Sequence, residues 1–331
     1  MAGAEAPPSA DFAIAERIVR AAGIERALTG VSEIGEGVKA RVLRLDFEHG
    51  EPLALKLYVK PDAARRELGA YAVLGSAVPQ VPKVVSSALG FEGAPHGYLL
   101  MSLAPGTPMN TKLADLGDAQ LVALYREIGE LLARFHAVEL PHFWPLLDEP
   151  GRGFDDNVSW FDDRVVLALR AFRENGANRY LAWCVERWFA EHRAGLDECP
   201  GPRFCHGDMH PANLRVAEVD GALRIVGALD LEISFGGDPA MDLVRTHHHR
   251  FPPRADLWRA MLDGYGDPPP WLDRVFDAYW LYHEIEIWNF FAGGGSRGAT
   301  RSIARRIARL TGASRWRILR SRMAALVSRQ S

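Results

Sequence analysis

The spacing of apolar residues changes once along the 331-residue chain, and this change constrains the fold more than any other feature. Up to Leu103, polar and apolar residues alternate in short runs such as Arg41–Phe47 and Leu53–Val59, which is the period of half-buried strands. The segment Ala104-Pro-Gly-Thr-Pro then breaks regular structure. After it, helical spacing is clearest over 119–137 and 178–193, with an irregular stretch over 142–163 between them. The pattern predicts an α+β chain with a β-rich part (1–103) and a mainly helical part (104–331).

Charge is unevenly distributed along the chain. Residues 287–331 contain ten arginines and no acidic residue, so the other 286 residues carry −13 within a total of −3. An acidic body favours cationic ligands, and a basic tail favours anionic ones. Ile303 and Ile307 stand at helical spacing in the tail. They predict amphipathic helices that pack on the body with the arginines outward.

Composition excludes several classes of protein. An apolar content of 48% supplies the core that disordered chains lack. Three cysteines without a Cys-x-x-Cys pair exclude a disulfide framework and a four-cysteine zinc site, and they predict reduced thiols. No run approaches 18 apolar residues, and the N-terminal residues lack a signal-peptide pattern. A cytoplasmic location is therefore expected, without a membrane as partner.

The segment with the most chemical information is Phe204–Val216, which contains Asp208 and, five residues later, Asn213. Asp230 follows seventeen residues after Asn213, at the end of an expected strand. Phosphoryl transfer needs a carboxylate that takes the proton of the acceptor hydroxyl, and oxygen ligands for the Mg²⁺ that bridges the nucleotide phosphates. The spacing predicts Asp208 as the catalytic base and Asn213 and Asp230 as metal ligands, in the order described for protein kinases.

Three blocks in this order resemble the aminoglycoside phosphotransferase family: His206-Gly-Asp-Met-His-Pro-Ala-Asn, Leu229-Asp-Leu-Glu and Gly237-Asp-Pro-Ala-Met-Asp-Leu. The resemblance covers about residues 31–291. Segments 203–208 and 280–286 are most similar to the hygromycin-type kinases. The resemblance implies a bilobal protein-kinase-like fold, with a small β-rich nucleotide-binding lobe (1–103) and a larger helical catalytic and substrate-binding lobe (104–331). It also implies ATP as the phosphoryl donor, with GTP as an alternative, and Mg²⁺ as cofactor.

The same resemblance assigns a lysine to the nucleotide phosphates. Lys56 lies inside the strand expected over 53–59, and the corresponding lysine of kinases contacts the α- and β-phosphates and pairs with a helix glutamate. Glu67, on the helix expected over 62–74, is assigned as that glutamate. Lys60, at the end of the strand, is the alternative lysine.

Two further nucleotide contacts follow from the resemblance. In the segment 34–40, Gly35 and Gly37 would let the backbone approach the phosphates, although a plain turn explains these glycines equally well. Ala40 stands where protein kinases have a third glycine. The segment 98–106 resembles the linker that binds adenine, so the base is placed on main-chain groups from Met101 to Leu103.

Departures from the protein-kinase pattern concern the acceptor. Asp230 is followed by Leu231 and Glu232 instead of Phe and Gly, and no Ala-Pro-Glu motif or long phosphorylatable loop follows. A small hydroxylated acceptor is therefore favoured over a protein. The hypothesis is inactivation of a cationic antibiotic, with a hygromycin-like aminoglycoside first, because an added phosphate would spoil its binding to RNA. A nucleoside antibiotic, a macrolide, a metabolite sugar or a protein serine is the alternative acceptor, and nucleic acid is not expected as a partner.

Several carboxylates have competing interpretations. Asp238 and Asp242 are predicted to cap and anchor a helix that begins near Pro239. Four other carboxylates are candidates for binding a cationic acceptor, and for each of them a solvated surface charge is an equally good alternative. These four are Asp162, Asp163, Glu284 and Glu286.

Histidines suggest a second class of function, a zinc-dependent hydrolase. His206 and His210 are four residues apart, and His247–His249 form a run. Glycine and proline within and beside the first pair disfavour the helix that would bring its members to one metal. We therefore expect His206 to brace the catalytic loop and the run to belong to a helix. A binding module with an inactive kinase fold is the third class, and the intact set of candidate catalytic residues disfavours it.

Overall fold

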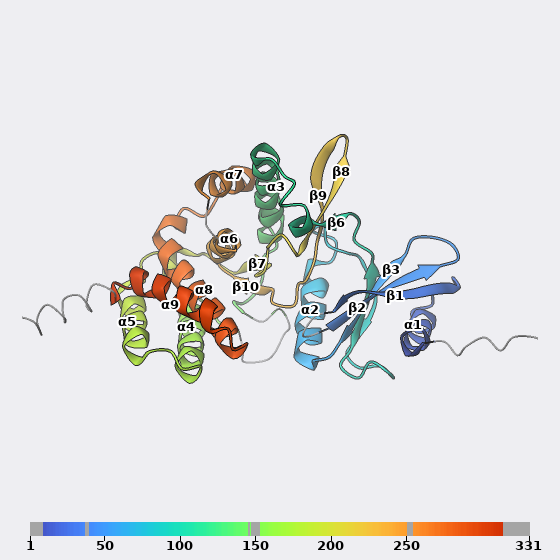
Figure 1. The fold of residues 1–331 in the computed structure, drawn as a ribbon, viewed down its shortest axis with the longest axis horizontal. Helices are drawn as coiled ribbons and strands as arrows, with labels where there is room; N and C mark the ends of the chain where they lie inside the picture. Colours follow the sequence, from blue (N-terminus) through green and yellow to red (C-terminus); the bar gives the residue numbers. More distant parts are fainter. Residues whose placement is uncertain (1–8, 37–39, 145, 147–152, 250–253, 314–331) are drawn as a thin grey trace, which may run out of the picture.

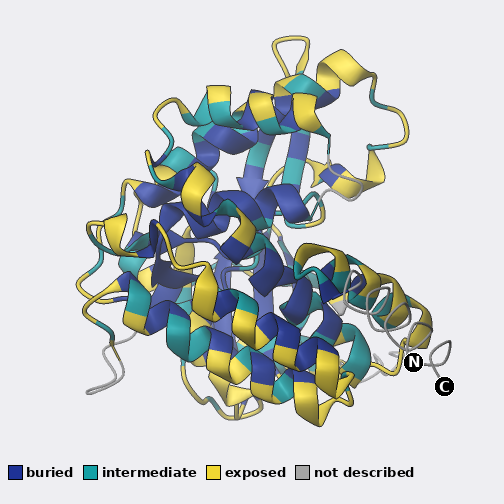
Figure 2. Cartoon of the chain, turned by 90° about the vertical axis from the view of Figure 1, so that its left-hand side faces the viewer, coloured by how far each residue is buried: buried dark blue, intermediate teal, exposed yellow. Residues whose placement is uncertain are grey.

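The computed structural model describes residues 9–36, 40–144, 146, 153–249 and 254–313. A β-rich lobe and a larger helical lobe lie side by side, with the N-terminal helix and the last described helix at opposite ends of the molecule (Figure 1). The α+β class predicted from the apolar spacing is confirmed. Buried residues run through both lobes, and exposed residues gather on the outer helix faces (Figure 2).

The first lobe is built on a five-stranded antiparallel sheet in the order β1-β2-β3-β5-β4. Its helices cover opposite faces of the sheet, because successive strand residues point to opposite sides. Leu55 and Leu100 pack with α1, and Ala54 and Leu99 pack with α2. Lys56 shares the α2 side with Ala54 for the same reason. The elements are α1 (Ala10–Ala21), β1 (Leu28–Glu36), β2 (Ala40–Phe47), β3 (Leu53–Tyr58), α2 (Pro61–Leu74), β4 (Val84–Ala88) and β5 (Tyr98–Ser102).

Helices form most of the second lobe. The closest contact is between α3 and α7, where a side chain on Gly129 would put Cβ 1.9 Å from the carbonyl oxygen of Met261. The helices are α3 (Asp118–His136), α4 (Asn157–Glu174), α5 (Arg179–Glu191), α6 (Pro239–His248), α7 (Ala255–Tyr265), α8 (Leu272–Gly293) and α9 (Arg297–Leu310), with 3₁₀ turns η1 (Met109–Thr111) and η2 (Leu196–Glu198). Asp162 and Asp163 lie in α4. The predicted irregular stretch over 142–163 is therefore wrong from residue 157 on, because Asp156 caps the helix by accepting from the Ser159 amide at 2.7 Å.

Short strands position the chemistry-bearing segment. β7 (Arg203–Cys205) pairs with β10 (Phe235–Gly237), and β6 (Thr107–Pro108) and β9 (Ala222–Ala228) flank β8 (Leu214–Val219). Thr107 and Pro108 were expected to be irregular, but they form two pairs with β8. The segment with Asp208 connects β7 to β8, and Asp230 follows β9 by two residues. Leu214, at the start of β8, pairs with Ala228, at the end of β9, so both segments lie at the same end of the β8–β9 hairpin.

The basic tail is described as far as α9. Ile303 and Ile307 are buried, as expected for an amphipathic helix. Arg306 does not point outward, however, because its guanidinium binds the buried carboxylate of Glu284. Residues 314–331, which hold the other half of the tail's arginines, lie outside the described residues. No helix in the described part of the chain combines the length and the apolar character needed to cross a bilayer.

Candidate active site

The loop that carries Asp208 is anchored through its backbone. The amides of His206 and Gly207 donate to the Asp242 carboxylate at 2.7 and 3.0 Å, and His136 Nε2 lies 3.2 Å from the same group. Gly207 has φ +77°, and a Cβ there would lie 2.7 Å from the Ile233 carbonyl oxygen, so the turn requires glycine. Asp242 thus anchors the loop, whereas the sequence assigned it to the following helix. That helix is capped by Asp238, whose Oδ1 accepts from the Ala240 amide at 2.9 Å.

His206 braces the loop, as the sequence predicts. The imidazole is fully buried, lies edge-on to Phe135, and places Nε2 3.1 Å from the Leu229 carbonyl oxygen. Burial lowers its pKa, although Asp242 and Asp208 oppose the shift, so the ring is neutral at pH 7. This contact ties the Asp208 loop to the residue that precedes Asp230.

Asp208 is held from several directions. Asn213 Nδ2 donates to the Asp208 carbonyl oxygen at 3.0 Å and to Oδ2 at 3.2 Å. His210 Nε2 lies 3.5 Å from Oδ2, and His249 Nε2 lies 3.4 Å from Oδ1. Burial by itself would raise the pKa of Asp208, but His210, His249 and Arg245 together hold it below its ordinary value. The carboxylate is therefore ionised at neutral pH, and a quarter of the side chain stays exposed.

Lys56 joins the two lobes. Its Nζ lies 2.7 Å from Glu67 Oε2 and 3.0 Å from Asp230 Oδ1, and Tyr58 donates its hydroxyl to the same Glu67 oxygen at 2.7 Å. Glu67 is 1% exposed, so this carboxylate depends on these partners. Burial opposes the charge on Lys56, but Glu67 and Asp230 prevail and raise its pKa. The ion pair between Lys56 and Glu67 that the sequence predicts is therefore formed.

The oxygen donors around Asp230 suit a hard divalent cation. Asp230 has φ +65°, a strained conformation for an aspartate, and such strain tends to occur at functional sites. Carboxylate oxygens of Glu67, Asp230 and Glu232 lie within 4.8 Å of one another. Asn213 uses its amide nitrogen on Asp208, which leaves its amide oxygen as the atom that can bind a cation. An all-oxygen set of this kind fits Mg²⁺. Glu232 was not predicted from the sequence as a member of this set, although it ends the Leu229-Asp-Leu-Glu block.

The other predicted nucleotide contacts are more dispersed. Gly35 lies at an irregular pairing of β1 with β2, and Gly37 lies outside the described residues. Met101 is buried in β5, where its sulfur accepts from the Tyr71 hydroxyl at 3.4 Å. Leu103 is the second residue after the β4–β5 pairing at Met101 and is half-buried. β5 ends at Ser102, so the main-chain groups near Leu103 lie beyond the strand pairing.

The four carboxylates predicted to bind a cationic acceptor all have partners within the protein. Asp162 accepts two hydrogen bonds from Arg193, at 2.7 and 2.6 Å, and Asp163 pairs with Arg164. Arg245 donates to Glu286 at 2.9 Å. Glu284 has no exposed surface and binds Arg306, so the prediction that it faces an acceptor is wrong: helix packing turns it into the core.

The histidines do not gather around one metal. His210 and His249 face Asp208, whereas His247 packs against Trp258. A different buried group, His136, Cys205 and Asp242, has its ligand atoms within 4.8 Å. Its carboxylate already accepts the loop amides, and burial raises the pKa of the Cys205 thiol well above its ordinary value. The contacts of this cluster are those of a hydrogen-bonded junction: Cys205 donates its thiol to the Asp238 carbonyl oxygen at 3.6 Å, and His136 Nδ1 lies 3.0 Å from the Tyr265 hydroxyl.

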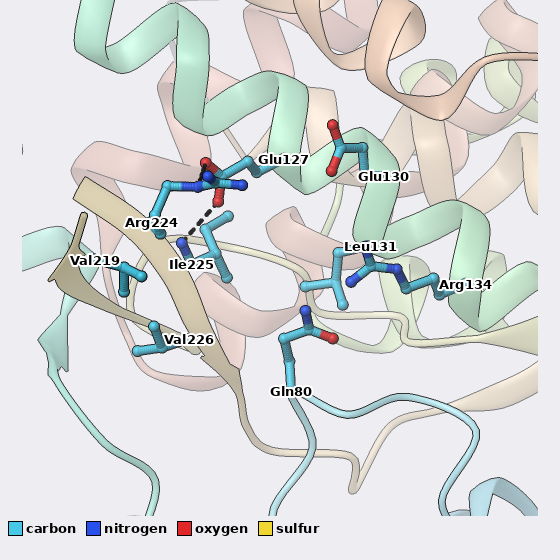
Figure 3. A pocket seen from close by; sticks show the side chains of 9 residues that line it. All are labelled: Gln80, Glu127, Glu130, Leu131, Arg134, Val219, Arg224, Ile225 and Val226. Carbon is cyan, nitrogen blue, oxygen red and sulfur yellow. Dashed lines mark hydrogen bonds and ion pairs between the residues drawn. The ribbon is translucent and has the colours of Figure 1, made fainter. Parts of the chain in front are cut away.

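A pocket of about 290 Å³ lies between α3, the β8–β9 hairpin and the loop before β4 (Figure 3). Glu127 spans part of it, because it accepts from the Ile225 amide at 2.8 Å and pairs with Arg224 at 2.6 Å. On another side, the Gln80 carbonyl oxygen accepts from the Ala228 amide at 2.9 Å. The predicted catalytic and nucleotide-binding residues are not part of its lining.

The fold and this arrangement define a class: kinase-like enzymes that transfer a phosphoryl group to a hydroxyl. A family model described as the phosphotransferase enzyme family matches residues 30–288, and the chain belongs to this family. The resemblance inferred from the sequence motifs is thereby confirmed.

Solved structures with the same fold include antibiotic and sugar kinases. Aminoglycoside phosphotransferase APH(4)-Ia is 16% identical, with a TM-score of 0.65, over 91% of this chain and 98% of that one. A thermostable mutant of that enzyme, in a ternary complex with AMP-PNP and hygromycin B, has a TM-score of 0.67 at 17% identity over 90% and 98% of the two chains. A putative fructosamine-3-kinase from Thermobifida fusca has a TM-score of 0.65 at 18% identity over 90% and 98%. At these identities the likeness establishes the fold.

Proposed function

We propose that this chain transfers the terminal phosphoryl group of ATP, or of GTP, to a hydroxyl of a small molecule. The observation that carries the proposal is the 3.0 Å contact between Lys56 Nζ and Asp230 Oδ1. It joins the lysine of the β-rich lobe to the aspartate that follows β9 in the other lobe. Nucleotide phosphates bound at Lys56 would therefore lie beside the oxygen donors of Asp230 and Asn213, close to Asp208.

Each residue has a defined part in this transfer. Asn213 donates a hydrogen bond to Oδ2 of Asp208 at 3.2 Å, whereas His249 approaches Oδ1 at 3.4 Å without a hydrogen bond, so we assign the proton of the acceptor hydroxyl to Oδ1. The acceptor oxygen bonds to phosphorus as the bond to the leaving nucleotide breaks. Lys56, held by Glu67, binds the remaining phosphates. Mg²⁺, when bound by Asn213 and Asp230, neutralises charge on the phosphate oxygens.

Two acceptor classes compete, and they differ in charge. An aminoglycoside is supported by the family and by structures of its members with hygromycin B and with kanamycin. A neutral or weakly charged sugar is supported by Glu286, whose partly buried carboxylate already binds Arg245 at 2.9 Å and is thereby less able to bind an ammonium group. The putative fructosamine-3-kinase among the similar structures is consistent with this second class.

Phosphate transfer from labelled nucleotide tests the proposal directly. The full chain, with Mg²⁺ and ATP or GTP, is incubated with hygromycin B, kanamycin or a fructosamine, and labelled products are separated. Asp208→Ala should abolish transfer while nucleotide binding survives, because the base is lost and the phosphate contacts remain. Asp277→Ala, an exposed carboxylate on α8, is the matched control and should keep full turnover. Unchanged turnover in Asp208→Ala would refute the mechanism.

The acceptor class is decided by the labelled product and by a resistance assay. If hygromycin B is the acceptor, a sensitive host that expresses the chain grows at higher antibiotic concentration, and Asp208→Ala removes the protection. Labelling of the sugar alone, without protection, assigns the second class. Asp162→Asn should leave the KM for the acceptor within about twofold in either case, because the exposed ion pair of Asp162 with Arg193 contributes little free energy.

A further inference from the structure

The last turn of α6 lies directly against Asp208. His249, the residue that ends this helix, places Nε2 3.4 Å from Asp208 Oδ1, the oxygen assigned to the acceptor proton. Its backbone amide donates to the Arg245 carbonyl oxygen at 3.1 Å, and the Arg245 charge also acts on Asp208. The position of this turn therefore sets the surroundings of the catalytic oxygen.

Two carboxylates of α8 hold the turn from the opposite side. Glu286 Oε2 accepts from Arg245 Nη1 at 2.9 Å, and Glu284 Oε1 lies 3.2 Å from His248 Nε2. His248 is 4% exposed and Glu284 is fully buried. A carboxylate buried to this extent must be neutralised, or it moves toward whatever donor remains.

Arg306 of α9 supplies that neutralising charge. Its Nε and Nη2 donate to the two Glu284 oxygens at 2.6 and 2.8 Å, a bidentate arrangement. The other arginines of α9, at positions 297, 301, 305 and 309, are exposed, so within the described part of the tail the inward position belongs to Arg306. Glu284 is thus shared between α9 and the last turn of α6.

We propose that Arg306 is a positioning residue for phosphoryl transfer: by binding Glu284 it fixes His248, and with it the contact of His249 with Asp208. The basic helix α9 thereby controls the catalytic centre from the far side of α8. The inference rests on the proposed function, because it takes Asp208 as the base. Glu284 and Glu286 then act on the catalytic loop through α6, whereas the sequence placed them at the acceptor.

Charge removal at Arg306 has a defined consequence. Without the guanidinium, the partner that remains for the Glu284 carboxylate among the described residues is His248. The buried charge then draws the imidazole out of place. His249 moves with it, and a displacement of about 1 Å at a catalytic group lowers the rate by about a hundredfold. Lys56 and Asp230 belong to other elements, so nucleotide affinity should not change.

Kinetics of Arg306→Gln test this reasoning, with Arg305→Gln on the same helix as the matched control. Formation of ADP from Mg·ATP is measured with hygromycin B, a fructosamine or water as acceptor. In Arg306→Gln we expect kcat to fall by about ten- to a hundredfold with KM for ATP within twofold. Arg306→Lys keeps one charged donor and should retain an intermediate kcat. If Arg306→Gln does not fold, the kinetics of Arg306→Lys test the inference in its place. Arg305→Gln should have the kcat and the KM for ATP of the parent chain.

Histidine-ring NMR provides a readout that does not depend on turnover. In ¹⁵N-histidine-labelled protein, the His249 ring signals are identified by their loss in His249→Asn. They should shift in Arg306→Gln and stay in place in Arg305→Gln. A lower melting temperature with unchanged kcat and unchanged His249 signals would overturn the inference and leave α9 as a structural cover. Absence of transfer by the parent chain to every acceptor would instead count against the proposed function, and the NMR comparison would still decide the positioning role.

Discussion

Asp242 is predicted to be the residue on which the catalytic loop depends most for its conformation. Its carboxylate is fully buried and receives the amides of His206 and Gly207 at 2.7 and 3.0 Å, with His136 Nε2 at 3.2 Å. Asp242→Asn keeps the shape of the side chain but replaces one acceptor oxygen with an NH₂ group. If the amide oxygen takes the place of Oδ2, it keeps the contacts with the His206 amide and His136, and the NH₂ group then faces the Gly207 amide, donor against donor.

The magnitude follows from the number of bonds. A hydrogen bond to a buried charge contributes about 1.5–3 kcal/mol, and a buried donor left without a partner costs about 1–3 kcal/mol, so loss of the Gly207 bond in Asp242→Asn should lower the free energy of unfolding by about 3–5 kcal/mol. The same substitution should lower kcat, because the Asp208 loop loses its anchor. Asp277→Asn, exposed on α8, is the control and should change neither quantity.

The assay is urea unfolding followed by tryptophan fluorescence, at neutral and at acid pH. Burial by itself would raise the pKa of Asp242, but His136, His206 and the Gly207 amide lower it. The contribution of a carboxylate with a lowered pKa is fully present above its unfolded pKa of about 3.9 and disappears as pH falls through the folded value. The stability difference between parent and variant should therefore be constant from pH 5 to 8 and shrink below about pH 3.9. A difference under about 1 kcal/mol at pH 7 would refute the anchoring role.

Three further predictions test the core and the interlobe contact. Lys56→Met should lower the unfolding free energy by about 3 kcal/mol in urea melts, because it leaves Glu67 buried without its cation, and adding Glu67→Gln should recover part of the loss. Gly129→Ala should destabilise the protein by about 3 kcal/mol, because its Cβ would meet the facing helix. Gly298→Ala, at an exposed position of α9, should instead stabilise it by no more than about 1 kcal/mol. In a Cys184→Ser, Cys199→Ser chain, Cys205 should react with DTNB at pH 8 only after unfolding, because burial raises its pKa; rapid reaction of that folded chain would contradict this.

Much of the fold was predictable because its signals are local. Strand alternation over 41–59, the helix that begins after Pro61 and the helices near 119–137 and 178–193 all depend on neighbouring residues, and the structure contains each of them. β6 was missed, because two residues carry no periodicity and their pairing with β8 joins segments more than a hundred residues apart. The start of α4 was missed because Trp160 and its polar neighbours resemble a loop until the Asp156 cap is recognised.

The sequence by itself determined the local chemistry. Asn213 follows Asp208 by five positions, so a single loop can close their hydrogen bond. Lys56 in β3 and Glu67 in α2 lie on consecutive elements, so a short connection brings them together. Tertiary structure alone decided which charged side chains pair with one another inside the protein. Arg306 with Glu284, and His249 with Asp208, meet only because α6, α8 and α9 pack at particular rotations, and a rotation is set by the whole core, not by spacing along one helix. For that reason the sequence left Glu284 as a candidate for acceptor binding with a surface charge as the alternative, whereas packing buries it against Arg306 of α9.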